Sequence, residues 1–144
     1  MHVSKAFTVI ELIFVIVIIG ILSAVALPKF AGIKTQADTV NAKAQLATIR
    51  SAIINERQKR LILGDSSYIT AANLDSGGLF GGVLVMPLTD SNTDGHWHAT
   101  GTAGQYTYKL DGVAVTFDYN ATTGALSCDS TNGTYGTQCG NIID

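Results

Sequence analysis

The sequence is short of the residues from which active sites and metal centres are built. Its 144 residues include two cysteines, Cys128 and Cys139, and no CxxC pair, which excludes zinc sites made from paired CxxC motifs. No Ser/His/Asp or Cys/His arrangement follows a catalytic spacing. The glycine-rich stretch 77–82 lacks the phosphate-loop pattern and its following lysine. We therefore expect no enzymatic activity.

Charge is also scarce, at 14% of residues, and it is unevenly placed. Residues 29–60 hold seven basic residues against two acidic ones, whereas residues 61–144 hold one basic residue against eight acidic ones. The two stretches could attract each other between copies of the chain, or they could be ordinary solvated charges. The acidic C-terminal part gives no specific nucleic-acid site.

One long apolar run dominates the N-terminal part. Residues 7–27 contain a single charged residue, Glu11, and as a helix they would span about 31 Å, close to the hydrocarbon thickness of a bilayer. Three interpretations are open. The run could be a signal peptide cleaved after Ala26, because Ala24-Val25-Ala26 has the A-x-A pattern. It could be a plain anchor, or the chain could be cut between Ala6 and Phe7.

Glu11 distinguishes these interpretations. A carboxylate inside an apolar segment costs about 2.5–3.5 kcal/mol on insertion scales, and the first two interpretations give it no partner. Cleavage before Phe7 would place a new amine about one helical turn from Glu11, where the two charges can neutralise each other. If the pair forms between copies, it fixes the register of packed helices and favours assembly.

The stretch Lys5–Glu11, followed by an apolar run, resembles the class III signal of type IV pilins and type II secretion pseudopilins. The resemblance implies cleavage after Ala6 by a prepilin peptidase, N-methylation of Phe7, and assembly roles for Thr8 and Glu11. One position departs from the family, which usually has Gly before the cut where this chain has Ala6.

The resemblance further implies a homo-oligomeric filament and an inner-membrane assembly platform. The subunit would be a single-pass inner-membrane protein, in contact with lipid, before it enters a periplasmic or cell-surface filament. A pseudopilin of a type II secretion or DNA-uptake machine is the alternative. Two further classes are a secreted soluble binding domain, released after Ala26, and an anchored metal- or glycan-binding module.

The predicted fold is α+β, with a long N-terminal helix packed on a small antiparallel sheet of three or four strands. Its parts are a leader (1–6), a membrane and assembly helix (7–28), an amphipathic continuation (29–63) and a globular head (64–144). Two apolar stripes follow helical spacing in the continuation. One contains Ile33, Ala37, Val40, Ala44, Ala47, Ser51 and Ile54, and the other contains Ala42, Leu46, Ile49 and Ile53.

Gly20 and Pro28 are expected to weaken the long helix, and Gly64 marks its expected end. Pro28 removes a backbone hydrogen bond, so we expect a kink between Gly20 and Pro28. The resemblance implies that this stretch can lose helical structure in filaments. Gly64 and the polar residues after it are expected to end the helix.

The head shows strand signals at 83–86, 105–110, 113–119 and 125–128. Asp111-Gly112 between two alternating runs is a tight-hairpin signal. In an exported chain Cys128 and Cys139 would form a disulfide that stabilises the head by about 2–3 kcal/mol. That loop resembles the C-terminal disulfide loop of many pilins, which favours a pilus subunit over the major secretion pseudopilin.

Three ligand or modification sites are weaker hypotheses. Asp90, Asn92 and Asp94 spell the first half of an EF-hand calcium loop, but Gly101 stands where the last ligand should be. His96 and His98 alternate as two transition-metal ligands without a third. Asn120 begins an N-x-T sequence and is a candidate for glycosylation, with a turn as the alternative. No cofactor is expected apart from calcium.

Overall fold

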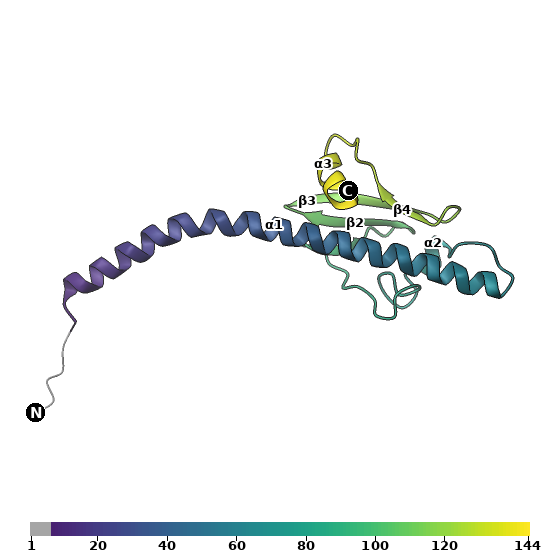
Figure 1. Ribbon diagram of the computed structural model, residues 1–144, viewed down its shortest axis with the longest axis horizontal. Coiled ribbons are helices and arrows are strands. Elements are labelled where there is room, and N and C mark those ends of the chain that lie inside the picture. The colour runs from purple at the N-terminus through teal and green to yellow at the C-terminus, as the bar shows by residue number, and fades with distance from the viewer. Residues whose placement is uncertain (1–6) are drawn as a thin grey trace, which may run out of the picture. The chain divides into compact units, whose positions relative to one another are not determined.

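The computed structural model describes residues 7–144, which fall into a first compact unit that ends at Gln36 and a second that comprises Ala37–Asp144. Helix α1 (Val9–Ile62) runs through both units (Figure 1). The second unit adds a short helix α2 (Ala71–Leu74), four strands and a C-terminal helix α3 (Gly136–Ile143). The strands are β1 (Trp97–Ala99), β2 (Gln105–Leu110), β3 (Val113–Asn120) and β4 (Ala125–Cys128). This confirms the predicted α+β fold.

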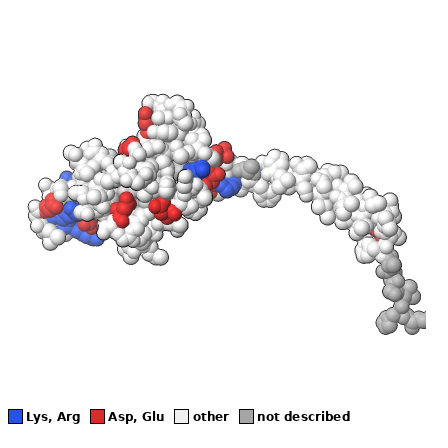
Figure 2. All heavy atoms as spheres, turned by 180° about the vertical axis from the view of Figure 1, so that it is seen from behind, with Lys and Arg blue, Asp and Glu red and all other residues white. Residues whose placement is uncertain are grey.

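The first unit is a single stretch of apolar helix. All of its large apolar side chains from Val9 to Phe30 are exposed, and its surface is almost free of charge (Figure 2). Among residues 7–144, α1 is the one helix long and apolar enough to cross a membrane. Gly20 and Pro28 both lie inside α1, and the helix continues through them. Such a continuous apolar surface needs lipid or other protein to cover it.

The C-terminus of α1 is closed by a Schellman motif. Gly64 adopts a φ of 86°, its N–H donates to the Leu61 carbonyl at 3.0 Å, and the Asp65 N–H donates to the Arg60 carbonyl at 2.9 Å. These two bonds satisfy carbonyls that would otherwise lack partners. The helix therefore ends at Ile62, one residue before the predicted end.

The sheet is a four-stranded antiparallel meander in the order β1-β2-β3-β4. Asp111 and Gly112 connect β2 to β3 with φ values of 53° and 76°, as a primed two-residue turn requires. Alternation buries every second residue of β2 and most of the inward residues of β3. The predicted hairpin and its buried face are both confirmed.

In the second unit, one of the two helical stripes of α1 is buried and the other is exposed. The stripe Ala42, Leu46, Ile49 and Ile53 is fully buried in the core, which it shares with the sheet. The neighbouring stripe Val40, Ala44, Ala47, Ser51 and Ile54 is exposed. We call this second set the outer stripe. One helix thus supplies the head with its core and also presents a face of mostly small residues.

Aromatic side chains fill the centre of the head. Trp97 contacts Phe80, Tyr108 and Phe117 with ring centroids 4.9–5.7 Å apart. Phe80 is buried despite a φ of 58°, which a bulky residue rarely adopts. One carboxylate, that of Asp75, accepts hydrogen bonds from the Phe80 N–H and the Tyr106 hydroxyl, both at 2.9 Å. The two bonds hold the loop in this conformation.

Polar contacts join the sheet to α1. The Tyr108 hydroxyl donates to the Asp38 carbonyl at 2.9 Å, and Arg50 donates through Nε and Nη2 to the Leu126 carbonyl of β4. The second contact satisfies an acceptor on the edge strand of the sheet.

A disulfide joins Cys128, the last residue of β4, to the buried Cys139 of α3, with 5.9 Å between the Cα atoms. It attaches the C-terminal helix to the edge of the sheet. The predicted disulfide is confirmed.

The strand predicted at 83–86 is wrong. The segment is a turn in which the N–H groups of Val83 and Leu84 both donate to the Phe80 carbonyl. A Cβ on Gly82 would collide with the Asn73 carbonyl, so the chain bends closely around α2 here. Val85 and Met86 are consequently 101% and 81% exposed. The fourth strand of the sheet is β1 instead, which pairs with β2.

Adjacent isoleucines test the assignment of the two stripes. Ile53 is 0% exposed and Ile54 is 53% exposed. We expect Ile53→Ala to lower the free energy of unfolding by about 3 kcal/mol, because it leaves a cavity in the core. Ile54→Ala is the matched control and should cost less than about 0.5 kcal/mol. Urea unfolding followed by near-UV circular dichroism measures both, and equal losses would contradict the assignment.

The buried tyrosines predict how stability depends on pH. Burial, with a smaller contribution from Asp38, raises the pKa of Tyr108 to about 12, and burial raises the pKa of Tyr106 and Tyr119 as well. The folded chain then keeps phenolic protons that the unfolded chain loses above pH 10. The free energy of unfolding should therefore fall as pH rises from about 10 to about 12.

Tyr108→Phe separates this residue from the other two. We expect a shallower fall between these pH values in that variant, measured by urea unfolding at several alkaline pH values. A slope identical to that of the unmodified chain would contradict the role of Tyr108.

Candidate assembly site

The N-terminus of α1 is organised by two residues predicted to act in assembly, Thr8 and Glu11. The Glu11 carboxylate accepts hydrogen bonds from the Thr8 N–H and the Thr8 hydroxyl, both at 2.9 Å. In return, the Thr8 hydroxyl accepts the Glu11 N–H at 3.3 Å. Since α1 begins at Val9, Thr8 is the N-cap and Glu11 the third helical residue. This is a capping box, in which each side chain satisfies a backbone donor of the other.

The capping box gives the carboxylate a local partner inside an otherwise apolar segment. Its signal is present in the sequence as T-x-x-E directly before an apolar run, although only assembly roles were predicted for Thr8 and Glu11. The arrangement also fixes where the carboxylate lies. It is held against the backbone N–H of Thr8, the residue that follows Phe7.

Phe7 is the first residue that the structure describes, and its side chain is exposed. The other predicted processing residue, Ala6, lies outside the described residues. A new α-amine on Phe7 would be one residue away from the N–H group that Glu11 already accepts. An α-amine is positively charged at neutral pH, with an ordinary pKa of about 8. The carboxylate therefore lies close to where a positive charge would appear after cleavage.

The outer stripe is a second candidate assembly surface, in the head unit. Its residues are mostly Ala and Ser, which let a helix or sheet approach the backbone of α1 closely. A shallow, mostly apolar groove runs between this face and the turn at Val83–Val85, and it is lined on the helix side by Ala47, Ser51 and Ala52. The exposed side chains of Val85 and Met86 lie at the same turn.

The predicted calcium ligands have other partners in the structure. The Asp90 carboxylate accepts from the Ala99 N–H and lies 2.7 Å from His98 Nδ1. The Asp94 carboxylate accepts the Gly112 N–H at 2.9 Å, and Asn92 is exposed. Within residues 7–144, no group of three His, Cys, Asp or Glu side chains is placed to hold a metal ion. A calcium site at this loop stays a prediction.

The two histidines have different hydrogen-bond partners in the structure. His98 lies in β1 beside Asp90, whereas His96 precedes the strand and its Nδ1 lies within 3.2 Å of the Thr93 hydroxyl and the Asp94 carbonyl. Each ring thus has polar partners of its own, and a transition-metal site at these two histidines stays a prediction.

Asn120 ends β3 on an exposed turn. Its side-chain oxygen accepts the N–H groups of Thr122 and Thr123 at 2.9 and 3.3 Å, which forms an Asx turn. The alternative given for this residue, a turn asparagine after a strand, describes its conformation. Glycosylation at the same side chain stays a prediction.

Comparisons with known proteins bear on the N-terminal segment first. Residues 1–27 match the family described as "Prokaryotic N-terminal methylation motif". Over 49 residues, 34% of its length, the chain is 53% identical to the "Type IV narrow pilus major component PilA5" of Thermus thermophilus. Over 96 residues, 66% of its length, it is 31% identical to the "Fimbrial protein" of Moraxella nonliquefaciens.

The matches cover 42% and 62% of the lengths of these two relatives. No solved structure gives a significant match to the chain. The resemblance to type IV pilins recognised from Lys5–Glu11 is confirmed by the family match and by both relatives.

Proposed function

Because the chain has the N-terminal methylation motif and resembles type IV pilins, we propose that it is the structural subunit of a type IV pilus-like filament. The observation that carries the proposal is the single carboxylate, Glu11, fixed at the first turn of an apolar helix beside the Phe7–Thr8 bond. In this proposal Glu11 acts in the packing of copies against one another rather than in catalysis.

The proposed maturation creates the partner for this carboxylate. A prepilin peptidase cuts between Ala6 and Phe7, and the amine of Phe7 is then N-methylated. A secondary amine stays positively charged, so methylation preserves the charge that faces Glu11 while it removes one hydrogen-bond donor. In the membrane the carboxylate is satisfied by the capping box. In the filament it also neutralises the amine of a neighbouring copy, which costs less than burying either charge alone.

The exposed apolar surface of the first unit supports the same order of events, first a subunit in the membrane and then a subunit in the filament. Its exposed side chains, from Val9 to Phe30, would be covered by lipid before assembly and by the corresponding helices of other copies afterwards. Helices gain little from hydrophobic transfer when they leave lipid, since both environments are apolar. A specific polar contact such as that of Glu11 can therefore decide the register between copies.

The proposal places the subunit in the inner membrane as a single-pass protein, where an assembly platform adds it to a periplasmic or cell-surface filament. A pseudopilus for secretion or DNA uptake is the alternative machine. The disulfide between Cys128 and Cys139 favours the pilus, because the resemblance associates this C-terminal loop with pilus subunits. Both relatives are also named as pilus or fimbrial proteins.

Processing is tested on the protein recovered from filaments or membranes. We expect the mature chain to begin at Phe7 and to carry one additional methyl group on its N-terminal amine. Intact mass and N-terminal sequencing measure both properties. A mature chain that begins at Leu27 would contradict the proposal, because removal of the first 26 residues would eliminate the apolar helix.

Two substitutions of Glu11 separate its capping role from its charge. Glu11→Ala removes both, and we expect it to abolish filaments while membrane insertion stays normal. Glu11→Gln can still accept the Thr8 N–H, because glutamine also completes a capping box, but it has no charge to pair with an amine. We expect Glu11→Gln to reduce filament yield at least tenfold, measured by electron microscopy and by the sheared filament fraction.

The outcome of the second variant is decisive. Normal filament yield from Glu11→Gln would refute charge pairing and leave capping as the role of the residue. Thr8→Val is the matched control for the cap, because it removes the hydroxyl and retains the carboxylate. If charge pairing governs assembly, this variant should form filaments in larger amounts than Glu11→Gln.

A further inference from the structure

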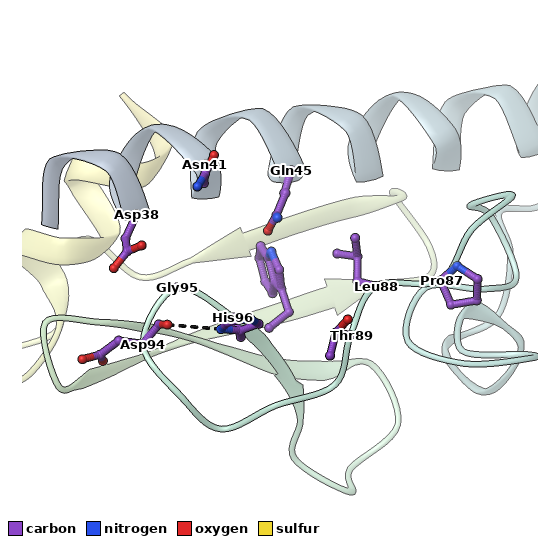
Figure 3. Close-up of a pocket in the computed structure, with 10 residues that line it drawn as sticks. Asp38, Asn41, Gln45, Pro87, Leu88, Thr89, Asp94, Gly95 and His96 are labelled. Atoms are coloured by element: carbon purple, nitrogen blue, oxygen red, sulfur yellow. Dashed lines mark hydrogen bonds between the residues drawn. The ribbon is translucent and has the colours of Figure 1, made fainter. Parts of the chain in front are cut away.

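The head contains a polar cavity that the assembly proposal does not use. It has a volume of about 420 Å³, within the range of small-molecule sites. One wall is α1 from Asp38 to Gln45, and the other is the segment from Pro87 to Trp97 (Figure 3). The cavity lies entirely within the second unit. Polar groups make up most of its lining.

Two buried polar atoms of the lining have no hydrogen-bond partner. They are Gln45 Oε1, an acceptor, and Trp97 Nε1, a donor. Trp97 is only 1% exposed, and the Gln45 side chain extends from α1 toward the opposite wall (Figure 3). A third such atom in residues 7–144, Arg60 Nε, lies 3.4 Å from a Glu56 carboxylate oxygen. A buried polar atom without a hydrogen bond lowers the stability of the fold, so we expect Gln45 Oε1 and Trp97 Nε1 to have hydrogen-bond partners.

The walls of the cavity are fixed by interactions of their own. The Gly95 N–H donates to the Lys109 carbonyl at 2.8 Å, and the Asp94 carboxylate accepts the Gly112 N–H at 2.9 Å. A Cβ on Gly95 would lie 2.8 Å from Asp38 Oδ1, so glycine is needed for the loop to approach the helix this closely. The Tyr108 hydroxyl holds the Asp38 carbonyl from the sheet side. The cavity is therefore built into the fold.

The donor and acceptor pattern limits what can fill the cavity. Trp97 Nε1 needs an acceptor and Gln45 Oε1 needs a donor, which a hydroxyl group can supply together. The carboxylates of Asp38 and Asp94 disfavour an anion. A simple cation offers no acceptor to Trp97. Asn41 and Thr89, which also line the cavity, can each both donate and accept.

We propose that this cavity binds a neutral polyhydroxylated ligand, a single saccharide unit, through Gln45, Trp97 and the polar residues around them. One hydroxyl bridges Gln45 Oε1 and Trp97 Nε1, and further hydroxyls donate to the carboxylates at the cavity's Asp38 end. This site is independent of Glu11 and of filament assembly.

The test uses the only tryptophan of the chain, Trp97, as its reporter. The full chain is placed in lipid nanodiscs, since glycoside detergents would compete. Its fluorescence is measured during titration with glucose, galactose and N-acetylglucosamine. We expect at least one of them to give a saturable change. Glucuronate differs from glucose by a carboxylate at C6, and we expect it to bind at least tenfold more weakly than glucose if glucose is the ligand.

Matched variants locate the binding site. Gln45→Met keeps the size of the side chain and removes its polar atoms, and we expect it to weaken binding about fivefold. Gln58→Met is the control, because Gln58 lies exposed on the same helix outside the cavity. If Gln45→Met alters the near-UV circular dichroism of the head, Asn41→Leu at the exposed rim replaces it, with the same expected direction.

Three results would overturn the proposal. The first is the lack of a saturable change with any of the three sugars. The second is equal affinity of the Gln45 or Asn41 variant and the unmodified chain. The third is a crystal structure, grown with the best of the sugars, in which Gln45 Oε1 and Trp97 Nε1 bond directly to each other and the cavity holds water alone.

Discussion

An ionised carboxylate cannot remain unpaired in an apolar environment, and Glu11 places one at the start of the long helix of this chain. The capping box answers this requirement locally by giving the carboxylate two donors from Thr8. It also keeps the negative charge at a defined point of an otherwise uniform helix. Apolar side chains alone would let such helices slide past one another, because each register buries a similar surface. A single polar position makes the registers unequal.

The head depends on the second part of the same helix. The core of the head includes four residues of this part of α1: Ala42, Leu46, Ile49 and Ile53. Hydrogen bonds join the helix and the sheet in both directions, from Tyr108 of β2 to the Asp38 carbonyl and from Arg50 of α1 to the Leu126 carbonyl. The disulfide then fixes the last helix to the strand farthest from β1. These contacts fall on one side of α1. They leave the outer stripe exposed, and its small side chains let another surface come close.

Much of this architecture follows from local sequence. Asp111-Gly112 specifies a hairpin because both positions need positive φ, and the alternation on either side fixes which face is buried. The segment 83–86 was predicted as a strand because four apolar residues in succession look buried. Its conformation depends on the close approach of Gly82 to α2 and on the turn closed by the Phe80 carbonyl, which no local pattern reveals. The T-x-x-E capping box was readable from sequence. The cavity at Gln45 and Trp97 was not, since it joins residues 52 positions apart.

Ile53 and Ile54 can report separately on the core of the head and on its surface by NMR spectroscopy. They are chemically identical neighbours, one inside the head and one on its surface. Their δ-methyl groups form a pair of NMR reporters on a single turn of helix. The first responds to the integrity of the core, whereas the second responds to whatever covers the outer stripe. A signal that moves at Ile54 while that of Ile53 stays in place records contact with another molecule without unfolding.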